Sequence, residues 1–398
     1  PYRIFTHASS CLGETLATVF DNDEDEEDRL FTLKELLEPL SQYSLIGWNY
    51  QRPYYSIHRL VQAVIRDQMN QSTTERWTAQ AIEVLIAAYP GEEFKYWDIC
   101  SDLLPHWLMV SEQTTAESES LALLNHYAGW YINEQGDYNK AENLYQKALS
   151  MRKNLLGSEH IATATTTTNL STLYFDRSLY QEAEKLCIEA LSIRRKLLGD
   201  ENIHVAGSIH NLAECYRLQG RYEEAEPLFE ESLDLRKQLL GDEHPDAALS
   251  LNNLAGIYIV QKRYSDAEQL LQEALMIRSQ CLGEGHPDTL STLNNLAECY
   301  RHQGRYSEAE PLFEKALKSY RQLWGNEHSN VALCLNNIAN CIDEQGRHKD
   351  AEALFEEAIS ISIKFLGEES VATANYYNNL AGCYRNQILY NEAESLYE

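Results

Sequence analysis

Six asparagines recur every 42 residues, and side-chain amides in such a row can hold a peptide backbone. They are Asn169, Asn211, Asn253, Asn295, Asn337 and Asn379. Each amide offers donors and an acceptor that suit an extended chain of any sequence. Inside a helix asparagine costs roughly half a kcal/mol against alanine, so keeping it in successive copies requires compensation. The compensation is either a peptide-binding ladder or bonds between neighbouring helices that fix their stacking, and the two can coexist.

Three arginines lie six residues beyond alternate asparagines and are candidates for selecting a partner. They are Arg217, Arg301 and Arg385. In the copies between them the same position holds Ile259 and Asp343. A guanidinium holds a carboxylate by paired hydrogen bonds, so arginines projecting into a groove predict a partner with acidic residues. Alternatively, they pair with the nearby Glu214 and Glu298 and have no binding role.

Other potential reactive groups do not form a recognisable catalytic or metal site. Four histidines recur at one position between the copies: His160, His244, His286 and His328. Because they recur at the repeat period, we expect each histidine to have the same local role in its own copy, namely capping of the loop. A shared metal site would need histidine side chains of different copies to converge on one point. The sequence has no G-x-x-x-x-G-K-[ST], H-E-x-x-H or G-x-S-x-G motif and no zinc-type Cys/His spacing. We therefore expect no enzyme activity, no cofactor and no metal.

These residues are positioned by a two-helix unit, illustrated by the copy 211–241. Cys215 belongs to an apolar stripe at three- and four-residue spacing, which indicates a first helix. Gly220 occupies the turn, where a positive φ is accessible. Ala225 and Phe229 belong to the stripe of a second helix, which ends at Gly241. One amphipathic pair cannot bury its apolar faces alone, so the 42-residue period predicts a stacked array.

The repeated G-x-Y-x-x-A-E core, present as GRYEEAE and GRYSEAE, resembles the tetratricopeptide repeat. The longer period resembles the 42-residue variety found in kinesin light chains. The resemblance covers residues 118–398, and it implies an all-α, right-handed superhelical solenoid of about seven helix pairs. It also implies that first helices line a concave groove, where Asn211, Asn253, Asn295 and Asn337 contribute to peptide binding. The last copy stops inside its second helix at Glu398, so we expect the array to continue.

The part before the array divides into three segments. Residues 1–28 form an acidic segment and residues 71–117 a helical connector. Within 29–70, a helical stripe, two short strands at 44–48 and 54–57 and a helix over 58–69 indicate a winged-helix-like unit. The phrases LSQYSLI and YSIHRLVQAVIRDQM resemble the winged helix that follows the nucleotide-binding core in signalling NTPases of the NB-ARC/STAND type. Its last helix offers only Arg59 and Arg66 as cations, so we expect a structural module and not a DNA reader.

The composition limits the partners and the compartment. The net charge of −28 repels phosphate backbones and anionic lipids, so we expect neither nucleic-acid nor membrane binding. No apolar run approaches the ~20 residues that span a bilayer. Nine cysteines include no C-x-x-C pair, which favours a reduced, cytoplasmic compartment. Four of them share one first-helix position and are interpreted as small core residues: Cys215, Cys299, Cys341 and Cys383.

The sequence thus predicts a non-enzymatic, protein- or peptide-binding array. The resemblance implies that it is the sensor region of a STAND-type NTPase whose nucleotide-binding core is absent from this chain. The alternative is a cargo or scaffold adaptor that binds extended peptides without a switching role. A further alternative is that another copy of the chain occupies the groove, and the sequence does not identify the ligand.

Overall fold

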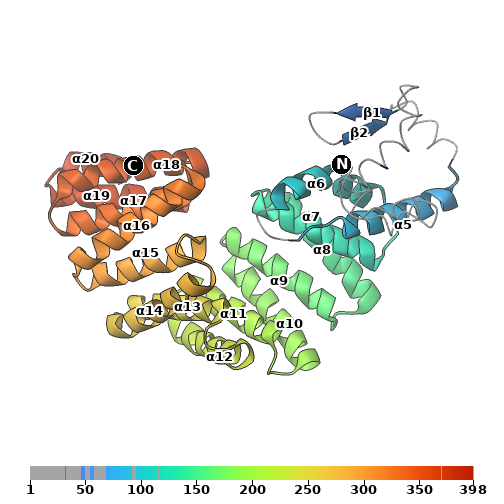
Figure 1. Cartoon of the computed structure of the whole chain (residues 1–398), viewed down its shortest axis with the longest axis horizontal. Helices are drawn as coiled ribbons and strands as arrows, with labels where there is room; N and C mark the ends of the chain where they lie inside the picture. The colour runs from blue at the N-terminus through green and yellow to red at the C-terminus, as the bar shows by residue number, and fades with distance from the viewer. Residues whose placement is uncertain are drawn as a thin grey trace. The chain divides into compact units, whose positions relative to one another are not determined.

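The computed structural model describes Thr32 and residues 46–49, 54–57, 69–91, 96–114, 116–368 and 370–397. Residues 119–397 form seven consecutive helix pairs (Figure 1). The first helices are α7 (Glu119–Glu134), α9 (Ile161–Asp176), α11 (Ile203–Leu218), α13 (Pro245–Val260), α15 (Pro287–His302), α17 (Ser329–Glu344) and α19 (Val371–Asn386). The second helices are α8 (Tyr138–Leu156), α10 (Tyr180–Leu198), α12 (Tyr222–Leu240), α14 (Tyr264–Cys281), α16 (Tyr306–Trp324), α18 (His348–Leu366) and α20 (Tyr390–Tyr397). The predicted all-α solenoid of about seven helix pairs is confirmed.

Two helices and a hairpin precede the pairs. Helices α5 (Gln71–Ala87) and α6 (Trp97–Gln113) occupy the segment predicted to be a helical connector. Strands β1 (Ile46–Asn49) and β2 (Tyr54–Ile57) pair antiparallel, close to the two strands predicted from the sequence. The acidic segment 1–28 and the helices predicted to flank the hairpin lie almost wholly outside the described residues, so the winged helix stays a prediction.

The chain separates into two compact units, residues 1–197 (unit 1) and residues 198–398 (unit 2). The core of unit 1 packs α5 and α6 against the first helix pairs, with Trp107, Leu121 and Tyr145 fully buried. A continuous cluster of buried side chains extends through unit 2 from Ala213 to Cys383. Each unit therefore has an apolar core of its own.

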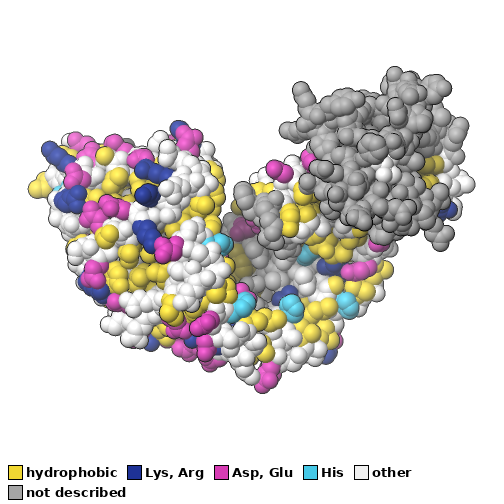
Figure 2. Space-filling view, in the orientation of Figure 1, with side chains coloured by type: hydrophobic (Ala, Val, Ile, Leu, Met, Phe, Trp, Pro, Cys, Tyr) yellow, Lys and Arg dark blue, Asp and Glu magenta, His cyan; other side chains and the backbone are white. Residues whose placement is uncertain are grey.

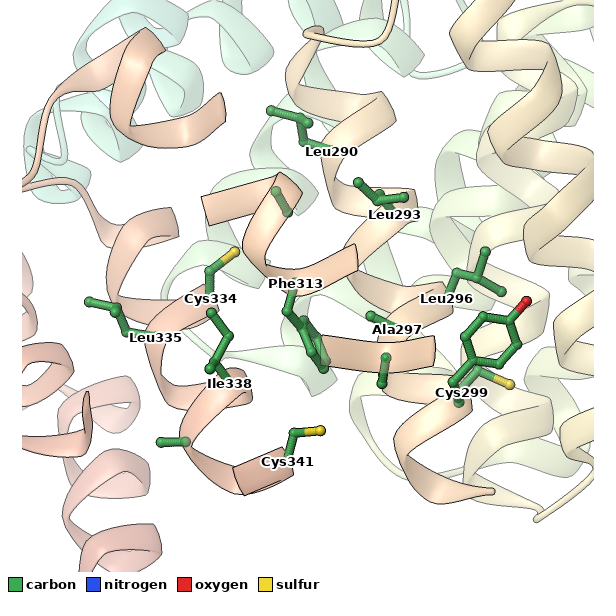
Figure 3. Close-up of a cluster of buried hydrophobic side chains, with 14 of the residues drawn as sticks. Leu290, Leu293, Leu296, Ala297, Cys299, Phe313, Cys334, Leu335, Ile338 and Cys341 are labelled. Carbon is green, nitrogen blue, oxygen red and sulfur yellow. The ribbon is translucent and has the colours of Figure 1, made fainter. Parts of the chain in front are cut away.

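The core of unit 2 is assembled by neighbouring pairs. Phe313 is fully buried and reaches from α16 into the space between α15 and α17, beside Ala297 and Ile338 (Figure 3). Four residues earlier, Ala309 is also fully buried; its small side chain lets the two helices of a pair approach closely. Residues of neighbouring pairs thus share one core, so a single copy cannot bury its apolar side chains alone.

Glycine ends or connects helices where the backbone needs a positive φ. Gly220 has φ +75° in the turn between α11 and α12, and Gly241 has φ +93° at the end of α12. A side chain in the left-handed region is strained, whereas glycine is not. The predicted turn and helix end are confirmed at both positions.

An ion-paired edge holds successive turns together. Acidic and basic side chains lie intermixed over unit 2 (Figure 2). At one turn, the Arg263 guanidinium lies over the Tyr258 ring, 3.7 Å from its centroid, and pairs with Glu226 of the preceding pair at 2.6 Å. The same arrangement recurs 42 residues later at Arg305, which lies over Tyr300. Much of the negative charge is therefore balanced locally, although the net charge stays strongly negative.

Candidate protein-binding face

The first helices of unit 2 form a continuous inner layer. Helix α11 contacts α13, α13 contacts α15, α15 contacts α17, and α17 contacts α19, whereas successive second helices have no comparable contacts among the described residues. Elements that pack more closely lie on the inside of a curved stack. The face of the first helices is therefore the concave candidate surface, of the kind that solenoids use for binding.

The asparagine row connects neighbouring first helices. Asn295 donates from Nδ2 to Asn252 Oδ1 at 3.0 Å, and Asn379 donates to Asn336 Oδ1 at 2.9 Å. Asn337 donates in the same way to Asn294 at 3.3 Å. Each bond joins one repeat to the preceding one. The stacking role considered from the sequence is therefore present in the structure.

The same amides retain capacity for a ligand. All six asparagines of the row are half-buried, not fully buried. A carboxamide has two N–H donors and an oxygen with two lone pairs. The bond from Asn295 to the preceding repeat uses one donor. The stacking bonds thus orient the amides, while the peptide-binding role stays a prediction.

Histidine replaces the bonded amide in two repeats. His210 Nε2 lies 3.3 Å from Asn253 Nδ2, and in unit 1 His126 Nε2 lies 3.2 Å from Asn169 Nδ2. His210 Nδ1 also lies 3.4 Å from Nη1 of Arg236. Burial, followed by the charges of Arg236 and Arg217, lowers the pKa of His210 to about 3. This ring is therefore a neutral member of the stacking ladder near pH 7.

Two of the three arginines proposed for partner selection hold carboxylates of their own chain. Arg217 grips Glu214 through Nε at 2.8 Å and Nη2 at 2.5 Å. Arg301 is only 9% exposed, grips Glu298 in the same way and also pairs with Glu344. These contacts match the alternative in which the arginines serve internal pairing. An acidic partner would have to compete with these glutamates, so selection of such a partner stays a prediction.

The pKa values of the two glutamates that pair with Arg301 are shifted from their usual range. Burial alone would raise the pKa of Glu298, but hydrogen bonds from His302 and Arg301 lower it to about 2. Burial raises the pKa of Glu344 despite the nearby Arg301 charge. In contrast to Arg301, Arg385 is exposed. Arg385 is thus the member of the predicted trio that is most accessible to a partner.

Sequence reasoning missed a set of buried arginines on the second helices. They are Arg152, Arg194, Arg236 and Arg278. Arg278 Nη1 donates to the Asp288 carbonyl at 2.9 Å and to Thr292 Oγ1 at 2.7 Å, which fixes the start of the next first helix. Its Nε has no hydrogen-bond partner, and burial lowers the pKa of the guanidinium. The recurrence of arginine every 42 residues was the sequence signal that could have revealed this set.

The recurring histidines cap helices, as predicted. Nδ1 of His244 accepts the backbone N–H of Asp246 at 3.1 Å, and His286 accepts that of Asp288 at 3.2 Å. His160 and His328 do the same at the starts of α9 and α17. Each of these histidines thus serves its own helix.

The four core cysteines are also where the sequence predicted them. Cys215, Cys299, Cys341 and Cys383 are fully buried, and every described cysteine is free. Within the described residues, no helix combines the length and apolarity that crossing a membrane requires.

The helix pairs and the continuous layer of first helices together define an all-α repeat solenoid with a concave candidate surface. The tetratricopeptide repeat family matches residues 119–196, 169–238, 204–277, 246–322 and 325–398. The chain belongs to this family. Residues 6–74 match a second family, described as a domain of unknown function (DUF7779).

Three proteins are similar to the chain in sequence or in structure. A nucleotide-binding leucine-rich repeat (NLR)-like protein of Hyaloscypha variabilis is 35% identical over 125 residues, 30% of this chain and 13% of the relative. The chain therefore matches about one-eighth of that curated relative. A STAND protein with a tetratricopeptide repeat sensor from Pyrococcus horikoshii shares the fold, with TM-score 0.55 and 14% identity over 100% of this chain and 62% of the other. A putative kinesin light chain of Podosopora anserina with TPR-like repeats aligns with TM-score 0.45 and 26% identity, over 52% and 99% of the two chains.

Proposed function

We propose that the array binds an extended protein segment along the inner face of unit 2, as the sensor region of a STAND-type signalling protein. The observation that carries the binding proposal is the row of half-buried asparagine amides, which lie on the helices of the inner layer and are oriented by cross-repeat bonds. Backbone groups of a bound segment would pair with the remaining donors and acceptors of these amides. Side chains that differ between copies would supply selectivity.

The sensor role is supported by two similarities and by the predicted front end. The partial relative is described as NLR-like, and the structural neighbour is described as a STAND protein with a tetratricopeptide repeat sensor. The β1–β2 hairpin matches the wing of the predicted winged helix. In such a switch, a bound segment shifts the equilibrium only by its differential affinity for the two states. An adaptor without a switch is the alternative.

The gene sequence upstream of Pro1 separates these two roles. A G-x-x-x-x-G-K-[ST] motif between a strand and a helix supports the sensor, because this loop cradles nucleotide phosphates. A continuous reading frame without such a core supports the adaptor. Both outcomes leave binding at the inner face to be tested separately.

Inner-face binding is tested best at residues outside the stacking bonds. Leu333 on α17 is 41% exposed and lies four residues before Asn337, on the same helix face. Leu323 on the second helix α16 is 47% exposed and is a matched control. Extended peptides are selected from a display library against the full chain, and their Kd is measured by titration. Leu333→Glu should weaken binding by about tenfold or more, through lost apolar contact and added charge, while Leu323→Glu should not.

The two substitutions also separate recognition from folding. Both replace a similarly exposed leucine by glutamate, so their melting temperatures should be alike. Equal affinity of the parent chain and the Leu333→Glu variant would place the binding surface elsewhere. Equal loss in both variants would indicate a general charge effect and not a groove.

A further inference from the structure

Three side chains with different metal-binding atoms lie together in unit 2. Asp343 is near the end of α17, His348 is the first residue of α18, and Cys383 lies on α19. One oxygen, one nitrogen and one sulfur atom of this trio lie within 4.8 Å of one another. His348 Nδ1 is 2.6 Å from Asp343 Oδ1. Carboxylate, imidazole and thiolate are the ligand types that zinc uses in proteins.

The trio departs from the repeat in two of its three members. The position of Asp343 holds Arg301 one copy earlier, and the position of His348 holds Tyr306. Cys383, by contrast, keeps the usual core cysteine. Its Sγ lies 3.4 Å from the His348 carbonyl, as Cys299 Sγ lies 3.4 Å from the corresponding carbonyl of Tyr264. Asp343 and His348 therefore add two ligand-type side chains beside a thiol that the fold already positions.

The surroundings suit a bound cation. Asn386 Nδ2 donates to Asp343 Oδ2 at 2.9 Å, which leaves Oδ1 turned to His348. Outer hydrogen bonds of this kind orient metal ligands. The side chains of Asp343 and His348 are 13% and 29% exposed, and Cys383 is fully buried. A surface hollow of about 410 Å³, lined by Gly346, Arg347, His348, Lys349, Asp350 and Gln387, opens the histidine side to solvent.

We propose that Asp343, His348 and Cys383 bind one divalent zinc-type ion, with the fourth position left to water or to a group of a partner. His348 coordinates through Nδ1 and carries its proton on Nε2, and Asp343 coordinates through Oδ1. Bonds from these two atoms to the ion replace the Asp343–His348 hydrogen bond. The S–H bond of Cys383 breaks, its proton passes to solvent, and a metal–sulfur bond forms. One carboxylate and one thiolate neutralise the two positive charges of the ion, and the nearby Arg347 is itself paired with Glu310 and Asp350.

The geometry requires only small movements. Zinc bonds of about 2.0–2.3 Å in a tetrahedron place ligand atoms roughly 3.3–3.7 Å apart. The present separations range from 2.6 Å to within 4.8 Å, so side-chain shifts of about 1 Å are sufficient. Burial, with the Asp343 carboxylate, raises the pKa of the Cys383 thiol to about 12; a coordinated metal nevertheless deprotonates a thiol. The ion would link the sixth helix pair to the seventh.

The test is titration of the metal-free full chain with Co²⁺, followed by displacement with Zn²⁺. A tetrahedral site with one thiolate gives Co²⁺ visible bands and a sulfur-to-metal charge-transfer band, at one ion per chain. Cys383→Ser should abolish the charge-transfer band. The double variant Asp343→Arg, His348→Tyr installs the residues of the preceding copy and should weaken binding by about 100-fold or more. Zn²⁺ should raise the Tm of the parent chain but not that of either of these two variants.

The chain provides its own control. Cys299 occupies the same repeat position as Cys383, but there Ile259 and Tyr264 hold the positions of Asp343 and His348 and offer no comparable ligands. Cys299→Ser should therefore keep the band, the stoichiometry and the zinc-dependent Tm. The proposal is overturned if Co²⁺ produces no thiolate band in the parent chain. It is also overturned if Cys299→Ser and Cys383→Ser lose the band equally, or if the double variant binds Co²⁺ as tightly as the parent.

Discussion

Asn295 on α15 donates a hydrogen bond of 3.0 Å to Asn252 on α13, one repeat earlier, and so fastens two first helices at the inner face. Asn252 in turn donates a hydrogen bond of 3.2 Å to Asn253, so the row of bonded amides continues. Asparagine has a low helix propensity, but here its side chain forms a hydrogen bond to a neighbouring helix that compensates for this cost. The same amide is half-buried and borders the proposed groove.

Removing that amide should cost stability in a measurable way. Asn295→Ala loses a net hydrogen bond of about 1 kcal/mol, partly offset by the better helix propensity of alanine. Asn375→Ala, at an exposed position on α19, gains the same propensity without losing a stacking bond. We expect the free energy of unfolding in urea to differ by about 1 kcal/mol between the two variants. Equal values would show that the cross-repeat bond does not stabilise the array.

His210 should make unit 2 sensitive to mild acid. Its folded pKa of about 3 lies below the usual 6.5 because the ring is buried, near Arg236 and Arg217. Between pH 3 and pH 6.5 this histidine is therefore protonated in the unfolded chain and neutral in the folded chain. The contribution is complete above pH 6.5 and falls by about 1.4 kcal/mol per pH unit below it.

The repeat itself supplies the control for this prediction. Asparagine occupies the equivalent position at Asn252 and Asn294, so His210→Asn should keep the ladder and reduce the loss of stability between pH 7 and pH 5. Denaturant unfolding of both proteins at several pH values gives the comparison. Identical pH slopes would exclude His210 as a source of acid sensitivity.

The buried arginines should matter far more than the exposed ones. Arg278→Ala removes the guanidinium donor from the Asp288 carbonyl and the Thr292 hydroxyl and opens a cavity, so we expect a loss of roughly 2–4 kcal/mol. Arg263→Ala removes exposed ion pairs and should have a clearly smaller effect. Urea unfolding of the two variants measures the contrast. Similar losses would contradict the structural role of Arg278.

The cysteines should differ sharply in reactivity. Burial raises the pKa of the Cys334 thiol to about 12, and that of Cys341 to about 11. Cys281 is exposed, and it is the one exposed cysteine in the described part of the chain. Since thiolate and access control alkylation, iodoacetamide at pH 8 should modify Cys281 first among these residues, as peptide mass mapping would show. Faster labelling of Cys334 would indicate opening of the core.

Much of the fold could be predicted because the same sequence signal occurs in successive copies. The alanine represented by Ala309, the turn at Gly220 and the cap at His244 each act within one copy or between its two helices. Their roles depend on local spacing, which the sequence displays directly. The boundaries of the helix pairs follow from the same signals.

The contacts between copies were harder to predict. Burial of Arg278 depends on Thr292, fourteen residues later in the next repeat. The sequence carries a trace of this pairing, because Tyr320 replaces the arginine in the copy where Cys334 replaces the hydroxyl. Arg301 was a candidate either for binding a partner or for pairing with Glu298, and its additional pairing with Glu344 depends on how neighbouring repeats stack. Sequence spacing alone does not give that geometry.

Amide hydrogen exchange of the full chain, with and without a selected peptide, tests the central claim most directly. Binding at the inner face predicts added protection in the first helices α13, α15 and α17, and little change in α14 and α16. Leu333→Glu should remove that protection while Leu323→Glu keeps it. Protection confined to the second helices or to the turns between pairs would contradict recognition by the asparagine-lined face.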